Sequence, residues 1–303
     1  MKGKSRLFRA VDLFYILLMA VPIVCAILLK VLTTPPTDGI SITGARIYFV
    51  LPMPVQDLPI TEAQLNSWFV ILAIGGLCLY LTHGITARAD TRRQHIAEWI
   101  VEKTESLVKE SMGTFFSGYA AFITAIIALS AFSSLMSLFG LYPPTSDVNV
   151  VGGWAILVFI LITYYKLKGG VGNYLKGFTE PIFIMTPLNI LGEVATPISM
   201  AFRHYGNVLS GSVIAVLVAA ALQGLSSLLL GWLPGVLGEI PFFQIGIPAV
   251  LSAYFDVFSG CMQAYIFAML TMLNVSGGFP QELYEERMAK KQEKKQNKTK
   301  VKN

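Results

Sequence analysis

Long apolar runs constrain the fold of this chain more than any other feature. One run extends from about residue 187 to residue 230, and another from about residue 248 to residue 275. A helix needs about 20 predominantly apolar residues to cross the hydrocarbon core of a bilayer, and both runs exceed that length. Because 54% of the residues are hydrophobic and only 14% are charged, the sequence predicts a polytopic, all-α membrane protein.

Six membrane-crossing helices are predicted, at about residues 13–32, 66–85, 118–140, 150–166, 187–230 and 248–275. The last two are too long for a perpendicular crossing, so we expect a long, strongly tilted C-terminal hairpin whose first arm is interrupted at Pro197. The first helix follows a basic start and is interpreted as an uncleaved membrane helix rather than a signal peptide.

Residues 86–114 form a polar segment between the second and third crossings. Apolar residues recur there at helical spacing, and charged residues fill the other face. This pattern predicts one amphipathic helix on the membrane surface. The alternative is a helix packed only against other loops.

Basic residues predict the orientation of the chain. Six crossings place the N-terminus, residues 86–114, the 166–177 link and the C-terminal tail on one side, and only Lys30, Arg46 and Arg203 lie outside these regions. Cytoplasmic segments are enriched in Lys and Arg, so both termini are expected in the cytoplasm, at a bacterial plasma membrane. The location of the basic residues matters more than the net charge of +5, which therefore does not indicate a nucleic-acid partner; the partner expected from the apolar runs is the lipid bilayer.

Three regions follow from this topology. Residues 1–65 comprise an N-terminal membrane helix and an outer loop, in which Ile40–Thr43 shows short alternation. Residues 66–280 form a membrane core, and residues 281–303 form a Lys-rich cytoplasmic tail. We expect the tail to be helical at first and disordered beyond.

Arg203 is the most informative single residue. It lies inside the first long apolar run, and no other Lys or Arg occurs within 25 residues of it. A guanidinium stays protonated in a protein, and a cation at the bilayer centre costs at least about 2.5–3.5 kcal/mol. Such a residue indicates a functional site with a charged partner. The neighbouring His204 is expected to point about 100° away on a helix.

Other polar residues in the long runs form two facing stripes. Asn207 follows Arg203 by one turn, while Asp256 and Gln263 are seven apart on the last helix and so share a face. Two antiparallel helices would juxtapose these stripes, and Glu193 lies ten residues before Arg203. A fixed cation, carboxylates and amides in low dielectric are suited to moving an ion. The alternatives are a structural Arg203–Asp256 ion pair and amides that only hold helices together, at ~0.6 kcal/mol each.

Catalytic and cofactor-binding patterns are absent from the sequence. It contains no HExxH or GxSxG motif and no Cys/His cluster, so we expect no metal, no cofactor and no catalytic residue. Gly169–Gly172 lacks the βαβ context of a phosphate loop. The glycosylation pattern at Asn274-Val-Ser is interpreted as chance, since that position is expected to face the cytoplasm.

Several motifs together resemble one known family, the a subunits of F-type ATP synthases. Arg203-His-Tyr-Gly-Asn207 resembles the family's Arg-x-x-Gly-Asn signature, and Gln263-Ala-Tyr-Ile-Phe resembles its last-helix signature. Asp147-Val-Asn149 resembles the outer loop motif, and Asn189-x-x-x-Glu193 with Pro197 resembles the entry to the fifth helix. The order and spacing hold over about two-thirds of the chain, from Asn66 to Val275.

The resemblance implies a stator subunit of a rotary motor. Two offset half-channels would carry H⁺ or Na⁺ to and from the carboxylates of a c-subunit ring, with b-type peripheral stalk subunits as further partners. The arginine matching Arg203 would force ion release from the arriving carboxylate and block leakage. The subunit would have no ATP site of its own. Ser212 stands where the family often has Glu or His, and Asp256 where it often has His or Glu, so Asp256 is expected to carry the outer acid alone.

Two other classes of function were weighed. An independent secondary transporter could use an intramembrane Arg to bind an anionic substrate, but such transporters favour internal repeats, and none is evident in this sequence. A membrane-embedded enzyme would need a nucleophile or a metal cluster. Co-purification with a small, carboxylate-bearing hairpin protein would separate the ATP synthase hypothesis from both.

Overall fold

The computed structural model describes residues 6–34, 44–54, 56–87, 91–179, 182–230 and 246–282, with a few single positions outside these ranges. Six of the described helical stretches are long and apolar enough to cross a membrane, as the sequence predicted. The chain is thus an all-α, multi-pass membrane protein. The alternating segment at 40–43 lies outside the described residues, as does most of the Lys-rich tail.

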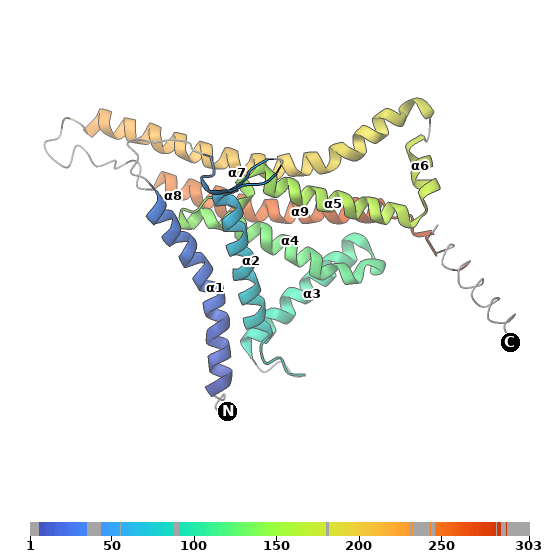
Figure 1. Ribbon diagram of the computed structural model, residues 1–303, viewed down its shortest axis with the longest axis horizontal. Coiled ribbons are helices and arrows are strands. Elements are labelled where there is room, and N and C mark those ends of the chain that lie inside the picture. Colours follow the sequence, from blue (N-terminus) through green and yellow to red (C-terminus); the bar gives the residue numbers. More distant parts are fainter. Residues whose placement is uncertain are drawn as a thin grey trace.

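The first two long helices form an antiparallel pair. Helix α1 spans Arg6–Thr33 and α2 spans Glu62–Thr82, and both run steeply away from the level of α7 and α9 (Figure 1). They approach closely at Gly76, where an added Cβ would lie 2.7 Å from the backbone nitrogen of Met19. Small residues permit such close contact between membrane helices, whose association depends on packing rather than on the hydrophobic effect.

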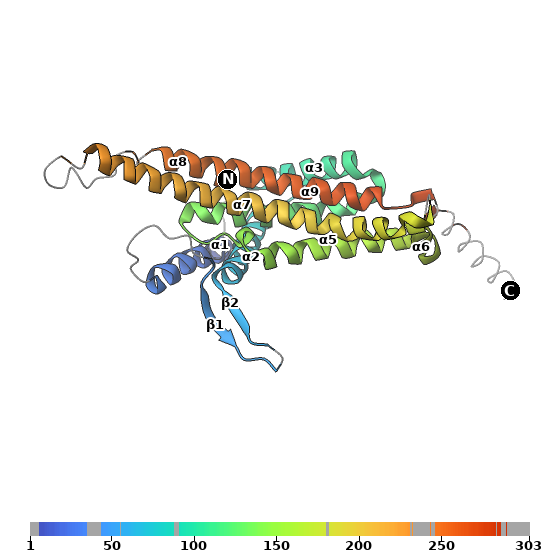
Figure 2. The ribbon, with the colours of Figure 1, turned by 90° about the horizontal axis from the view of Figure 1, so that it is seen from above.

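The remaining long helices form an elongated layer. Helices α5 (Val148–Lys168), α7 (Thr186–Leu230) and α9 (Gly260–Gly277) lie side by side along the long axis (Figures 1 and 2). Helix α4 (Ala120–Leu135) is flanked by the short helices η1 (Thr114–Tyr119) and η2 (Met136–Phe139), and it packs on α9. The main core joins α4, α5, α7 and α9 through the buried side chains of Ile123, Val158, Met200, Phe267 and Met272.

Helix α3, Arg92–Met112, is the predicted amphipathic helix. Thr91 caps its N-terminus through a hydrogen bond from the Gln94 backbone, and Gly113, at φ +83°, ends it. Some of its apolar residues are buried in the protein and others are exposed. Val108 is fully buried in the main core, whereas Trp99 is 59% exposed. The helix therefore packs on α4 and α9 at one end and leaves an indole outside, which suits a membrane interface.

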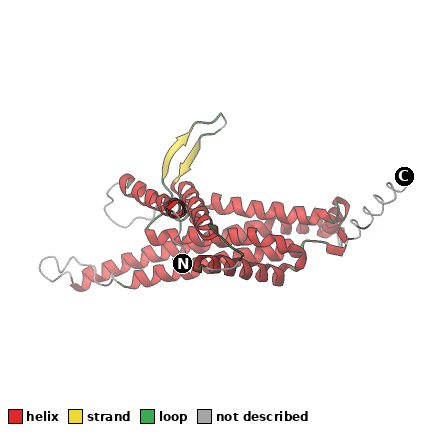
Figure 3. Ribbon diagram, turned by 90° about the horizontal axis from the view of Figure 1, so that it is seen from below, coloured by secondary structure: helices red, strands yellow, loops and turns green. Residues whose placement is uncertain are grey.

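The loop between α1 and α2 contains a β-hairpin that the sequence did not predict. Strands β1 (Ile47–Leu51) and β2 (Leu58–Thr61) pair antiparallel, with a register irregularity between Ile47 and Phe49, and they project from the helical body (Figure 3). Thr61 ends β2 and caps α2 in a capping box with Gln64. This reciprocal pair of hydrogen bonds starts α2 at Glu62, four residues before the predicted start.

Three further features differ from the predicted elements. The 166–177 link contains a short helix, α6 (Val171–Thr179), and η4 (Phe183–Met185) precedes α7. Pro197 does not interrupt the fifth crossing, because α7 is continuous through it. An interior proline removes one helical hydrogen bond and bends a helix, and α7 curves along its length (Figure 1). The last crossing is α8 (Ile247–Ser252), a π-helical segment η7 (Ala253–Ser259), and then α9.

Candidate functional site

Arg203 lies on an exposed face of α7. The residue itself is exposed, and its neighbour Phe202 is 59% exposed. Within the described part of the chain, no ion pair includes Arg203, and none joins it to Asp256. The alternative of a structural Arg203–Asp256 pair therefore does not hold in this structure. A permanent cation on an apolar helix face is left facing outward, without an anion from its own described residues.

His204 points the other way, as the helical spacing predicted. It is fully buried, and its Nε2 lies 3.3 Å from the Ser130 hydroxyl. The rings of Trp154 and Phe267 pack against it edge-on. His204 thus packs against α4, α5 and α9 and does not lie on the exposed surface that carries Arg203.

Asn207 joins α7 to the last helix. Its side-chain Nδ2 donates to the Ser259 hydroxyl at 2.9 Å and lies 3.5 Å from the side-chain Oε1 of Gln263. The Ser259 hydroxyl in turn lies 3.2 Å from the side-chain Oδ1 of Asn207. The two predicted polar stripes therefore meet, and they do so one helical turn from Arg203.

Among the described residues, Asp256 has no hydrogen bond to this amide cluster. It is in the π-helical segment η7, and its carboxylate accepts a hydrogen bond from the Ser252 hydroxyl. The expectation that Asp256 and Gln263 share one face assumed α-helical spacing, and π-helical turns change that spacing. Insertions of this kind are frequent at functional sites. Gln263 contacts Asn207, while Asp256 is half-buried and bonded within its own turn.

Glycines bring the last crossing against its neighbours. An added Cβ at Gly211 of α7 would lie 2.8 Å from the ring of Phe255. An added Cβ at Gly260 would lie 2.7 Å from the Ser134 side chain of α4. Both distances are shorter than van der Waals contact, so only glycine permits these helix approaches. The segment that carries Asp256 is therefore held between α4 and α7.

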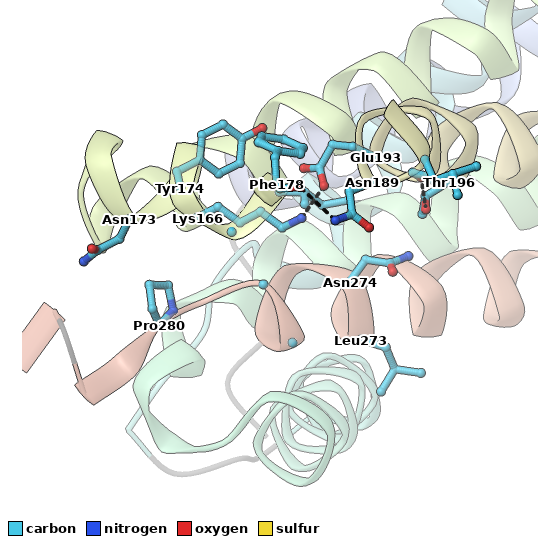
Figure 4. A pocket seen from close by; sticks show the side chains of 16 residues that line it. Lys166, Asn173, Tyr174, Phe178, Asn189, Glu193, Thr196, Leu273, Asn274 and Pro280 are labelled. Atoms are coloured by element: carbon cyan, nitrogen blue, oxygen red, sulfur yellow. Dashed lines mark hydrogen bonds and ion pairs between the residues drawn. The ribbon is translucent and has the colours of Figure 1, made fainter. Parts of the chain in front are cut away.

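Glu193 lines a cavity of about 670 Å³ near the beginning of α7. Its Oε2 lies 2.5 Å from the Nζ of Lys166, at the end of α5 (Figure 4). Asn189, Tyr174 and Asn274 line the same cavity from α7, α6 and α9. The polar groups of four helices thus converge on one cavity, and Glu193 lies ten residues before Arg203 on α7.

Tyr174 contributes a neutral donor to this cavity. Burial raises the pKa of its phenol, and the Glu193 carboxylate adds to the rise. The hydroxyl therefore stays protonated at neutral pH and remains able to donate a hydrogen bond. Among the residues that line the cavity, Lys166 and Glu193 are the two that carry a charge.

Two other candidate residues have local structural roles. Ser212 is exposed, and its hydroxyl donates to the Leu209 carbonyl at 2.8 Å. Asp147 caps the N-terminus of α5, where its carboxylate accepts from the Asn149 backbone at 2.9 Å. Neither residue is in the amide cluster or lines the Glu193 cavity.

Sequence reasoning missed several polar residues of the cavity, among them Lys166, Tyr174 and Asn274. The sequence indicates Lys166 only as part of the basic orientation signal and Asn274 only as a chance glycosylation pattern. A basic residue at the end of one crossing and an acid near the start of the next could have indicated a pair. Nothing in the sequence pattern of Asn274 indicates its place in the cavity.

Comparison with known proteins identifies one family. The sequence pattern of the family described as "ATP synthase A chain" matches residues 64–276. Among curated proteins, "ATP synthase subunit a, sodium ion specific" of Propionigenium modestum is 26% identical over 276 residues, which cover 80% of this chain and 86% of that protein. "ATP synthase subunit a" of Staphylococcus carnosus (strain TM300) is 28% identical, over 74% of this chain and 95% of that one. The family match spans more than half of the sequence and includes every membrane crossing after the first. The chain therefore belongs to the ATP synthase a-subunit family of the F0 membrane sector.

Proposed function

We propose that this chain is the stator ion-channel subunit of a rotary F-type ATP synthase. It would carry H⁺ or Na⁺ through two half-channels to and from the carboxylates of a c-subunit ring. The observation that carries the proposal is Arg203, an exposed cation on a membrane-length apolar helix with no anion from the described residues of its own chain. A passing carboxylate on a partner supplies that anion.

Arg203 would act on the ring by electrostatics. A deprotonated carboxylate is attracted to a guanidinium, and the attraction is stronger in low dielectric than in water. The pair therefore favours the ion-free form of the carboxylate and promotes release of its H⁺ or Na⁺. Since the guanidinium keeps its charge, it also repels a cation that would pass directly from one half-channel to the other.

Two separate polar regions near Arg203 support two pathways. The amide cluster of Asn207 and Gln263, with Asp256 beyond it, would line the outer half-channel together with Ser212 and the loop at Asp147. The cavity at Glu193 would form the inner half-channel. Ten residues at ~1.5 Å each put Glu193 roughly 15 Å from Arg203 along the helix, too far for a direct pair. An ion would thus have to travel on the ring to cross between them.

The orientation follows from the basic residues. Both termini, α3 and the Glu193 end of α7 would face the cytoplasm of a bacterium, because Lys and Arg gather on that side. The name of the Propionigenium modestum protein states that it is sodium ion specific. For this chain the ion is H⁺ or Na⁺, since selective ligands would lie mainly on the partner ring. The b-type stalk subunits would complete the complex.

The test is Arg203→Ala in the assembled ATP synthase. ATP-driven charge movement would be followed in inverted membrane vesicles with a potential-sensitive dye, with and without Na⁺. We expect loss of pumping and of ATP synthesis while the subunit still inserts and assembles. Arg203→Lys should fail as well, because an ammonium lacks the guanidinium fork and loses its proton more readily when buried. Pumping at the wild-type rate in Arg203→Ala would refute the proposal.

A further inference from the structure

The cavity at the beginning of α7 contains a cation of its own. Lys166 places its Nζ 2.5 Å from Glu193 Oε2, and the two side chains are 27% and 13% exposed. A carboxylate at the mouth of a cation pathway raises the local cation concentration. A lysine in the same place opposes that effect. The pair therefore needs an explanation that the proposed half-channel alone does not give.

The path of the Lys166 side chain is built into the fold. An added Cβ at Gly278, just after α9, would lie 2.9 Å from Lys166 Cε and 3.1 Å from its Cγ. The lysine stem thus occupies the space that a side chain at 278 would fill. It runs from the end of α5, past the end of α9, to the carboxylate on α7. Three helices fix the approach of this ammonium to Glu193.

Glu193 keeps unused capacity to bind a cation. Its Oε2 accepts from Lys166, and its Oε1 is buried with no hydrogen bond of ordinary geometry among the described residues, although the Tyr174 hydroxyl interacts with the carboxylate. An ionised carboxylate has about four acceptor positions. The adjoining cavity, at about 670 Å³, has room for several water molecules at about 30 Å³ each. A hydrated ion could therefore reach the free oxygen without first breaking the fold.

We propose that Lys166 is a tethered competitor for the transported cation at Glu193. Its ammonium occupies the cation position at Glu193 Oε2, and an ion that enters the inner cavity displaces it. The inference rests on the proposed function. Conduction needs binding strong enough for entry and weak enough for exit. A tethered ammonium meets that need, because it returns to the carboxylate and releases the ion instead of leaving it trapped.

The competing explanation is a structural ion pair that only fastens α5 to α7. Charge-neutral variants of similar size separate the two explanations. In the assembled complex, Glu193→Gln would leave the ammonium unpaired in the mouth, and we expect ATP-driven charge movement to fall by at least about threefold through repulsion of the entering ion. The double variant Glu193→Gln/Lys166→Gln removes the repelling charge and should recover most of that loss.

Lys168 provides a matched control. It lies two residues further along the chain, and its ammonium sits over aromatic rings, 4.4 Å from the Tyr165 centroid, and does not line the cavity. Glu193→Gln/Lys168→Gln removes the same unit of charge and should stay as impaired as Glu193→Gln. The recovery must therefore be specific to the lysine that faces the carboxylate.

Salt dependence supplies a second readout that a structural role would not change. The Debye length falls from about 30 Å at 0.01 M to about 8 Å at 0.15 M ionic strength. With choline chloride as a salt that is not transported, the deficit of Glu193→Gln should shrink across that range. A double variant no better than Glu193→Gln, or a deficit independent of salt, would overturn the competitor role. Loss of pumping in Arg203→Ala would be unaffected by either outcome, so the proposed function is tested separately.

Discussion

Gly211 offers a direct test of how α7 positions the last crossing. In Gly211→Ala the new Cβ would lie 2.8 Å from Phe255 Cδ1 and 3.1 Å from Phe255 Cβ. Turning the ring relieves the first contact but not the second, because Cβ moves only with the backbone. The π-helical segment must therefore shift away from α7. Overpacking of this kind costs about 1–3 kcal/mol, equivalent to about a five- to 150-fold loss of the correctly packed state.

The shift would act on Asp256, which follows Phe255 in the chain. We expect Gly211→Ala to lower ATP-driven charge movement in inverted vesicles severalfold and to lower the temperature at which the complex loses activity. Gly224→Ala is the matched control, since Gly224 is exposed on the same helix and an added Cβ meets nothing within 4 Å. If Gly211→Ala pumps and withstands heat as well as Gly224→Ala, the close approach does not position the segment.

Two further outcomes are expected from the proposed pathways and orientation. In pumping assays Asp256→Ala should lower ion transport far more than Glu193→Ala, while Asp256→Glu, which keeps the charge, should retain substantial activity; normal transport by Asp256→Ala would move the outer pathway to other residues. Cysteines placed at Glu98 and Glu105, in a background without the three native cysteines, should react with an impermeant reagent only from the cytoplasmic side. Labelling from outside would contradict the proposed orientation.

The membrane crossings could be predicted because run length and composition reflect the thickness of the bilayer directly. Continuity through Pro197 could not, since a proline ends a helix or bends it according to what packs around it. Pro197 is buried, and it lines an apolar groove of about 280 Å³ with residues of α5. The start of α2 could have been predicted from the sequence, because Thr61 and Gln64 have the capping-box spacing.

The candidate site was predictable where it depends on helical periodicity. The meeting of Asn207 with Gln263 follows from two stripes on antiparallel helices, and the opposite directions of Arg203 and His204 follow from 100° per residue. Asp256 instead bonds within its own turn, in a π-helical segment that no pattern in the sequence indicates. The Lys166–Glu193 contact depends on how α5, α7 and the end of α9 at Gly278 pack together. The periodicity of a single helix carries no information about such packing.

The length of α7 bears on the offset between the two proposed half-channels. Its 45 residues span about 67 Å as a straight helix, whereas a bilayer with its headgroups is about 40–45 Å thick. A helix that stays within that thickness must tilt by about 50°, beyond the range of about 0–40° found for most membrane helices. At a tilt of about 50° the roughly 15 Å from Glu193 to Arg203 becomes about 10 Å in depth and about 11 Å along the membrane plane. A rotary mechanism requires that an ion enter and leave the ring at laterally separate positions. On this geometry, the length and tilt of α7 would supply part of the lateral separation that the two proposed half-channels require.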